Sequence, residues 1–276
     1  MSQLDGWYEG ADGLRLYYRA WQPAGPPAAA VVLLHGLGDH SGLYPMVGDY
    51  FLPRGVAVYA PDLRGNGRSP GQRGYIGRWC ELREDLRCFV ARVRGELPDA
   101  PLFLMGNSLG GLVALDFALA YPAPLGGVIA IAPPLGALGV PAPLLLLGRV
   151  LSHVWPRFSL QTGMDLSGLS RDPAVVDEVL ADPLFHRRGT ARLSTEVTAT
   201  IARVQAAAPR FPVPVLILHG EADRMVPPDG SRIFVARVGH PDKRLILYPG
   251  GYHVLLADLD HDRVLADVGE WIDRHR

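Results

Sequence analysis

A strand-length apolar run, a G-x-S-x-G pattern and a helix-length segment follow one another between residues 102 and 121. The apolar run covers 102–105, the pattern covers 106–110, and 112–121 is rich in good helix formers. A strand that turns sharply into a helix at this pattern is typical of a nucleophile elbow, whose two glycines leave room where a Cβ would clash. The pattern predicts that Ser108 is an outward-pointing nucleophile. The alternative is a glycine-rich turn that carries a surface serine.

Further strand-length runs and helical segments alternate along the chain. The runs lie at 29–34, 56–60, 125–132, 213–218 and 244–247, and the helical segments at 43–53, 78–97, 230–238 and 258–275. Such alternation predicts an α/β fold with a mostly parallel sheet flanked by helices. Residues 7–9 and 14–21 predict an antiparallel hairpin at the sheet edge.

The alternation is interrupted between residues 134 and 209. This segment contains several prolines, an apolar run at 144–147 and helix-like stretches at 173–180 and 190–207, but no strand signal. We therefore expect a core formed by residues 1–133 and 210–276, with a helical cap at 134–209.

Composition excludes several classes of protein. The chain has 276 residues, a net charge of −1 and 48% hydrophobic residues, which argues against disorder and against nucleic-acid binding. It carries no signal-peptide pattern and no apolar stretch long enough for a membrane span, so we expect a cytoplasmic protein.

Cys80 and Cys88 fall eight residues apart on one predicted helix, too far apart for a disulfide, and are expected to be free thiols. No metal-binding motif is present, and no metal or cofactor is expected.

An activated serine needs a base, and the base needs an orienting acid. Of the nine histidines, only His35, His219 and His253 lie just past a predicted strand, where functional loops of a parallel sheet gather. His253 lies in a glycine loop before the last helix, and Asp223 lies in the loop after the preceding strand. The order Ser108, Asp223, His253 is the order of an α/β-hydrolase triad. Asp229 is an alternative acid.

The oxyanion of an acyl-transfer intermediate needs main-chain donors. The residue after the nucleophile, Leu109, supplies one N–H, and the glycine loop after the strand at 29–34 supplies the second from Leu37. We expect the His35 side chain to brace this loop. The same loop resembles part of a dinucleotide-binding fingerprint, but Ser41 stands where the third glycine is required.

Four motifs resemble the monoacylglycerol lipase and lysophospholipase branch of the α/β-hydrolases. They are His35-Gly-Leu-Gly-Asp-His-Ser-Gly-Leu-Tyr44, Asp62-Leu-Arg-Gly-Asn-Gly-Arg-Ser69, Gly106-Asn-Ser-Leu-Gly-Gly111 and His219-Gly-Glu-Ala-Asp223. The resemblance implies an α/β-hydrolase fold, the triad Ser108, Asp223 and His253, the oxyanion donors Leu37 and Leu109, and a helical cap over an apolar tunnel. The chain departs from the family pattern where Leu109 replaces Met, Asn66 replaces His and Leu43 replaces Arg.

The expected function is hydrolysis of fatty-acid carboxylic esters by a serine hydrolase, with a monoacylglycerol as the small lipid ester substrate. A general carboxylesterase, a lysophospholipase, an acyltransferase and a non-catalytic ligand-binding protein on the same fold are the alternatives. Candidate substrate contacts are Asp39, His40, Leu138, Leu144, Trp155 and Phe158. An apolar cap also suggests transient contact with a membrane surface.

Overall fold

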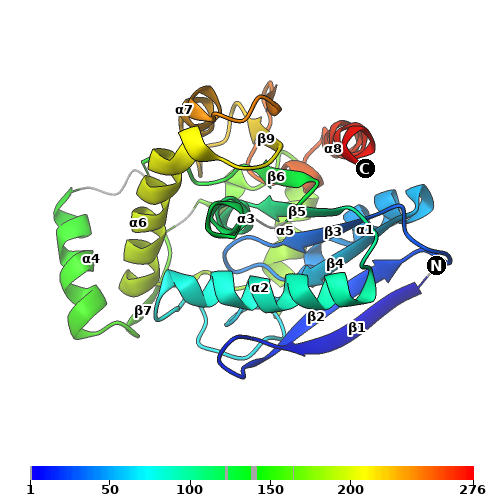
Figure 1. The fold of residues 1–276 in the computed structure, drawn as a ribbon. Helices are drawn as coiled ribbons and strands as arrows, with labels where there is room; N and C mark the ends of the chain where they lie inside the picture. The colour runs from blue at the N-terminus through cyan, green and yellow to red at the C-terminus, as the bar shows by residue number, and fades with distance from the viewer. Residues whose placement is uncertain (1, 122–123, 138–141, 164) are drawn as a thin grey trace.

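A mixed eight-stranded sheet forms the centre of the molecule (Figure 1). The computed structural model describes residues 2–121, 124–137, 142–163 and 165–276. The strands of this sheet are β1 (Ser2–Glu9), β2 (Arg15–Gln22), β3 (Ala29–Leu34), β4 (Val56–Pro61), β5 (Leu102–Asn107), β6 (Gly127–Ile131), β9 (Val215–Gly220) and β10 (Lys243–Tyr248). Their order is β1-β2-β4-β3-β5-β6-β9-β10; β1 and β2 form the expected antiparallel hairpin, β2 is antiparallel to β4, and all other pairs are parallel.

Helices cover both faces of the sheet. They are α1 (Pro45–Phe51), α2 (Trp79–Glu96), α3 (Leu109–Ala120), α4 (Ala142–Val154), α5 (Pro173–Ala181), α6 (Ala191–Ala207), α7 (Asp229–Arg237) and α8 (His261–His275). Alternate residues of β3 point to opposite faces, so Val32 joins the apolar core shared with α2 and α3, and Val31 joins the core shared with α1 and α8. Burial on both faces explains why the parallel strands are continuous apolar runs rather than alternating ones.

The arrangement of the strands decides where functional loops meet. Because β3, β5, β9 and β10 are parallel, the loops after them gather at one edge of the sheet. The α/β-hydrolase class expected from the sequence is therefore the observed fold.

The insertion (residues 134–209) lies between β6 and β9 and contains α4, α5 and α6. The expectation that it contains no strand is wrong, because β7 (Ser159–Gln161) and β8 (Arg188–Thr190) pair as a short antiparallel ribbon. Three-residue strands are too short to produce a period-two pattern. Helix α4 is longer than the apolar run that marked it, because it extends through polar residues to Val154.

Buried polar contacts attach α6 to the core. Asp116 of α3 is buried and accepts hydrogen bonds from Trp79 Nε1 at 2.8 Å and Arg203 Nη2 at 2.8 Å. Glu196 accepts a further bond from the Trp79 N–H at 2.7 Å. Helix α4 packs on α6 and lies beyond it, away from the sheet (Figure 1). The insertion thus has an inner helix fixed to the core and an outer helix fixed to that inner helix.

Candidate active site

Ser108 occupies a strained turn between β5 and α3. Its backbone dihedrals are φ 51° and ψ −118°, a region that non-glycine residues rarely adopt, and its N–H donates to Ile131 O at 2.8 Å. A Cβ built on Gly106 would lie 2.3 Å from the Gly110 carbonyl, and one on Gly110 would lie 2.2 Å from Leu34 O. Only glycine fits at both positions, so the turn has the geometry that the G-x-S-x-G pattern predicts.

Two further side chains meet Ser108 in a hydrogen-bonded chain. His253, in the loop after β10, places Nε2 2.9 Å from Ser108 Oγ. Its Nδ1 lies 2.7 Å from Oδ2 of Asp223, in the loop after β9. With the carboxylate ionised, Nδ1 carries the proton and Nε2 accepts from the serine hydroxyl. The structure thus brings together the three residues that the sequence selected, whereas the alternative acid Asp229 is exposed at the start of α7.

The Asp223 carboxylate is surrounded by donors. Its Oδ1 accepts the N–H groups of Met225 and Val226 at 2.9 Å each, and His219 Nε2 lies 3.3 Å from Oδ2. Burial alone would raise the pKa of Asp223, but hydrogen bonds from His219 and His253 lower that pKa well below its usual range. Asp223 is therefore an ionised partner for an imidazolium at neutral pH.

His219 is a supporting residue that the sequence reasoning passed over because it directly ends a strand. Its Nδ1 lies 2.8 Å from Ser231 Oγ, and its Nε2 lies 2.8 Å from Val226 O. The available signal was its position four residues before Asp223 in a tight glycine turn.

The loop of residues 35–39, here called the oxyanion loop, passes beside the elbow. A Cβ on Gly36 would lie 3.5 Å from Ser108 Cβ, so this loop borders the serine. His35 Nδ1–H donates to Gly36 O at 2.7 Å, while its Nε2 accepts the Leu63 N–H at 2.9 Å. His35 therefore braces the loop, as the sequence analysis expected, and fixes the peptide group that carries the Leu37 N–H.

The polar candidates for substrate contact also hold this loop. Asp39 Oδ2 accepts from Tyr44 Oη at 2.9 Å and from the Gly36 N–H at 3.3 Å. His40 Nδ1 accepts the Gly42 N–H at 3.1 Å, which leaves Nε2–H for Asp182 Oδ2 at 3.1 Å. Both side chains thus lie beside the oxyanion loop and have protein partners there.

The apolar candidates lie in the insertion. Trp155 follows α4 and is 58% exposed, and its ring centroid lies 4.7 Å from that of the half-buried Phe158. Leu138 lies outside the described residues, as does the side chain of Leu144. The two aromatic side chains therefore pack against each other just after the C-terminal end of α4.

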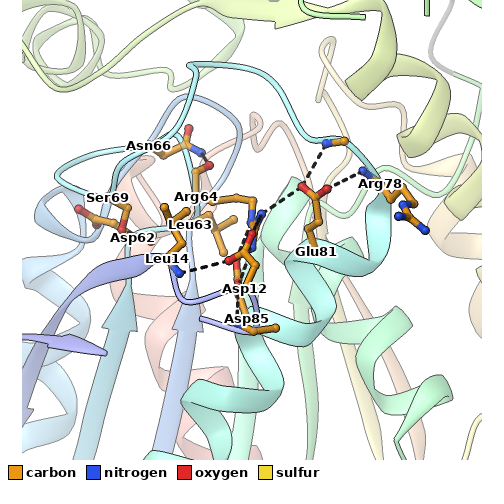
Figure 2. Close-up of polar contacts among 12 residues, drawn as sticks. Asp12, Leu14, Asp62, Leu63, Arg64, Asn66, Ser69, Arg78, Glu81 and Asp85 are labelled. Atoms are coloured by element: carbon orange, nitrogen blue, oxygen red, sulfur yellow. Dashed lines mark hydrogen bonds and ion pairs between the residues drawn. The ribbon is translucent and has the colours of Figure 1, made fainter. Parts of the chain in front are cut away.

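Two arginines of the loop after β4, Arg64 and Arg73, have several protein partners. Arg64 is only 9% exposed and pairs with Asp85 at 2.7 Å, and with Glu81 and Asp12 at 3.1 Å each (Figure 2). Arg73 donates to two carbonyl groups of the same loop, those of Gly65 and Gly67. Arg64 and Arg73 therefore hold this loop in shape.

The carboxylate of Asp258, shortly before α8, joins the insertion to the loop that carries His253. Asp258 is buried and accepts from Arg171 Nε at 2.9 Å and from the Tyr252 N–H at 2.9 Å. These bonds hold the loop that carries His253 against the insertion. Within the described ranges, no group of three or more acidic, histidine or cysteine side chains is arranged to hold a metal ion. Cys80 and Cys88 are free, as expected.

Residues 25–260 match the Hydrolase_4 family, described as serine aminopeptidase, S33. The chain belongs to this family. A monoacylglycerol lipase from Mycolicibacterium smegmatis is 34% identical over 97% of this chain and 96% of its own length. A monoglyceride lipase from Mus musculus is 33% identical over 96% of this chain and 89% of its own length.

Solved structures of similar proteins agree with the observed fold. The monoacylglycerol lipase of Paleococcus ferrophilus superposes with a TM-score of 0.86, at 34% identity over 95% of this chain and 99% of that chain. A soluble variant of the Saccharomyces cerevisiae monoglyceride lipase, in complex with a substrate analogue, gives a TM-score of 0.88 at 26% identity over 97% of this chain and 94% of that chain. The resemblance found in the sequence motifs thus extends over nearly the whole chain.

Proposed function

We propose that the chain hydrolyses monoacylglycerols to glycerol and a fatty acid, with Ser108 as nucleophile, His253 as general base and Asp223 as the acid that orients it. The observation that carries this proposal is the continuous hydrogen-bonded chain from Ser108 through His253 to Asp223 at a strained elbow. Relatives at 33–34% identity over nearly the full chain are lipases of this substrate class, which makes the chain a carboxylic ester hydrolase.

The geometry supports a two-step acyl transfer. As Ser108 Oγ attacks the ester carbonyl carbon, His253 Nε2 takes the hydroxyl proton. His253 then gives that proton to the departing glycerol oxygen, so the acyl group remains on Ser108. A water molecule then attacks the acyl-enzyme while His253 takes its proton, and His253 gives that proton to Ser108 Oγ as the fatty acid is released. The ionised Asp223 stabilises the imidazolium in both steps.

Two main-chain N–H groups are proposed to stabilise the oxyanion. Leu109 begins α3 directly after the nucleophile, and Leu37 lies in the oxyanion loop beside Ser108. The brace from His35 supports this role, because a fixed Gly36 carbonyl fixes the N–H on the other side of the same peptide group. Loss of one such donor typically reduces kcat by 10²–10³-fold.

The insertion is proposed to act as a cap domain over residues 1–133 and 210–276. Its inner helix α6 is anchored by Asp116, and its return to the core passes beside the oxyanion loop. A cap in this place covers the serine with apolar and polar side chains and leaves a long acyl chain a sheltered path. A general carboxylesterase or a lysophospholipase would use the same triad, and the alternatives differ in the group attached to the acyl chain.

Substrate panels test the reaction class. We expect the purified protein to cleave 1- and 2-monoacylglycerols faster than triacylglycerols, lysophosphatidylcholine or p-nitrophenyl acetate. Ser108→Ala should reduce turnover by 10⁴–10⁶-fold without altering the fold, and Asp223→Asn and His253→Ala should each remove most of it. Equal turnover by Ser108→Ala, or preference for aminoacyl p-nitroanilides, would contradict the proposal.

We propose further that the exposed apolar side chains of α4 and β7 make transient contact with a membrane surface. This outer patch consists of Leu146, Leu147, Val150, Val154, Trp155 and Leu160, each more than half exposed. Exposed apolar surface that is gathered within a short stretch of the chain, here 146–160, is typical of an interaction site. Among the described helices none is long and apolar enough to span a bilayer, so contact would be peripheral.

Vesicle sedimentation tests this contact. Wild-type protein should sediment with phosphatidylcholine vesicles more than Leu147→Ser/Trp155→Ser does, because the two substitutions remove buried apolar area at the interface. Leu259→Ser, at an exposed leucine outside the outer patch, is the matched control and should sediment like wild type. Identical sedimentation of all three proteins would exclude the outer patch as a membrane contact.

A further inference from the structure

The oxyanion loop is held from the insertion as well as from the core. The segment Asp182–Thr190, here called the return segment, leads from α5 into α6. Within it, the His186 N–H donates to Gly38 O at 3.1 Å. Gly38 has φ +80°, and a Cβ built on it would lie 1.9 Å from His186 O. The two main chains are therefore in direct contact, with no room for a side chain between them.

The side chain of His186 fixes the main chain that makes this contact. Its Nδ1 accepts the Arg188 N–H at 3.2 Å, so the ring proton is on Nε2 and is donated to Asn66 Oδ1 at 2.9 Å. The Asn66 amide group in turn donates through Nδ2 to Arg64 O at 3.0 Å (Figure 2). A continuous path thus joins the buried Arg64 ion cluster to Gly38 through Asn66 and His186.

His186 is suited to this structural task and not to proton transfer. Burial and the nearby Arg73 guanidinium lower the pKa of His186 to about 4, so the imidazole is neutral at physiological pH and keeps the tautomer that the contacts require. Its two ring nitrogens are both engaged by Arg188 and Asn66.

The main chain on either side of Leu37 is held by residues from two different parts of the molecule. The peptide before Leu37 is held by His35 from the core, and the Gly38 carbonyl is held by His186 from the insertion. We propose that His186 and Asn66 are positioning residues for the oxyanion hole, so that the insertion completes the hole in addition to covering the acyl chain. This inference rests on the proposed roles of Ser108 and the Leu37 N–H.

The test uses small dissolved esters, which need no acyl tunnel. His186→Phe keeps a planar ring but lacks the Nε2–H donor, whereas His186→Gln keeps an N–H in about the same place. With p-nitrophenyl acetate, we expect His186→Phe to lower kcat by about 10–100-fold with KM changed less than twofold, because a displaced donor loses part of its transition-state stabilisation. His186→Gln should recover most of the rate. His153→Phe, an exposed histidine of the same insertion, is the matched control and should behave as wild type.

Binding of a transition-state analogue separates positioning from general damage. An alkyl trifluoromethyl ketone forms an oxyanion on Ser108, so its affinity for His186→Phe should fall by the same factor as kcat/KM. Asn66→Leu should give a similar loss, and the double variant should lose little more than either single variant, because both break one interaction. If His186→Phe fails to fold, Asn66→Leu with the same two measurements carries the test.

Three outcomes overturn the inference: an unchanged kcat in His186→Phe, a change confined to KM, or fully additive losses in the double variant. Inactivity of the wild-type protein and of His153→Phe toward every ester would instead contradict the proposed function.

Discussion

Two histidines near the site, His35 and His186, are kept neutral by their surroundings. Burial lowers the pKa of His35, and burial together with Arg73 lowers that of His186 to about 4. In the unfolded chain both pKa values return to about 6.5, so the unfolded chain binds protons first as the pH decreases. The free energy of unfolding is therefore unaffected by these groups above about pH 6.5 and falls below it, in the case of His186 down to about pH 4.

Substitution of His186 tests whether this histidine contributes to the loss of stability as the pH decreases. His186→Gln removes one of the two groups, so the loss of stability between pH 7 and pH 5 should be smaller than in wild type by about 1 kcal/mol, a figure reduced for the partial exposure of the site. Urea unfolding at the two pH values measures this difference. His153→Gln, at an exposed histidine, provides the control. An equal loss in His186→Gln and wild type would show that His186 is already protonated in the folded protein at pH 5.

For single residues, the sequence predicts a catalytic role where a short local motif marks the residue. Ser108 follows from two glycines, and Asp223 and His253 follow from their positions after strands in the expected order. The contact of Asn66 with His186 could not be predicted, because the two residues are 120 positions apart and His186 lies in no motif, although Asn66 lies in one. The supporting role of His219 was easier to predict, because it lies only four residues before Asp223. That role still depends on how the loop between the two residues folds.

At the scale of elements, one buried carboxylate contributes to the attachment of α6 to the core. Asp116 accepts from Trp79 Nε1 and from Arg203, and it is 2% exposed. Asp116→Ala leaves the Trp79 Nε1–H without its acceptor and the Arg203 guanidinium without its carboxylate partner. We expect the free energy of unfolding to fall by about 2–4 kcal/mol, measured by urea denaturation.

Two further variants provide comparisons for the stability loss of Asp116→Ala. Asp116→Asn keeps an acceptor for Trp79 Nε1 and should lose less stability than Asp116→Ala. Glu270→Ala breaks an exposed pair with Arg274 on α8 and should cost no more than about 0.5 kcal/mol. A loss in Asp116→Ala as small as that in Glu270→Ala would mean that this carboxylate does not hold α6.

The elements of the core were predictable because burial on both faces produces apolar runs of strand length, as in β3 and β5. The insertion was less predictable for two reasons. Helix α4 has apolar residues on its exposed side, which obscures helical periodicity, and β7 and β8 exist only because residues far apart in the chain pair with each other. Where tertiary pairing creates an element, local pattern carries no signal of it.

At the scale of the whole molecule, the insertion is anchored unevenly. Helix α6 is tied to the core through Asp116, through the Trp79 N–H and through Gln205, which donates to Gly230 O at 2.9 Å. Helix α4 packs on α6, where Ser152 Oγ lies 2.9 Å from Thr195 Oγ1, and its outer face is exposed. Local stability follows the amount of buried contact, so the outer helix should open more readily than the inner one.

Hydrogen exchange measured by mass spectrometry tests this difference. Amides of residues 147–154 should exchange at least 10-fold faster than those of 197–204, since opening α4 exposes little apolar surface and leaves the α6 anchor intact. Reaction of Ser108 with a long-chain alkyl phosphonate should slow exchange in α4, because an acyl-like chain beneath the cap adds apolar contacts that opening would break. A methyl phosphonate on the same serine is the control and should leave α4 exchange unchanged. Equal protection of both helices in the free protein would contradict the uneven anchoring, and slowing by the methyl phosphonate would indicate that the cap responds to the oxyanion loop and not to the acyl chain.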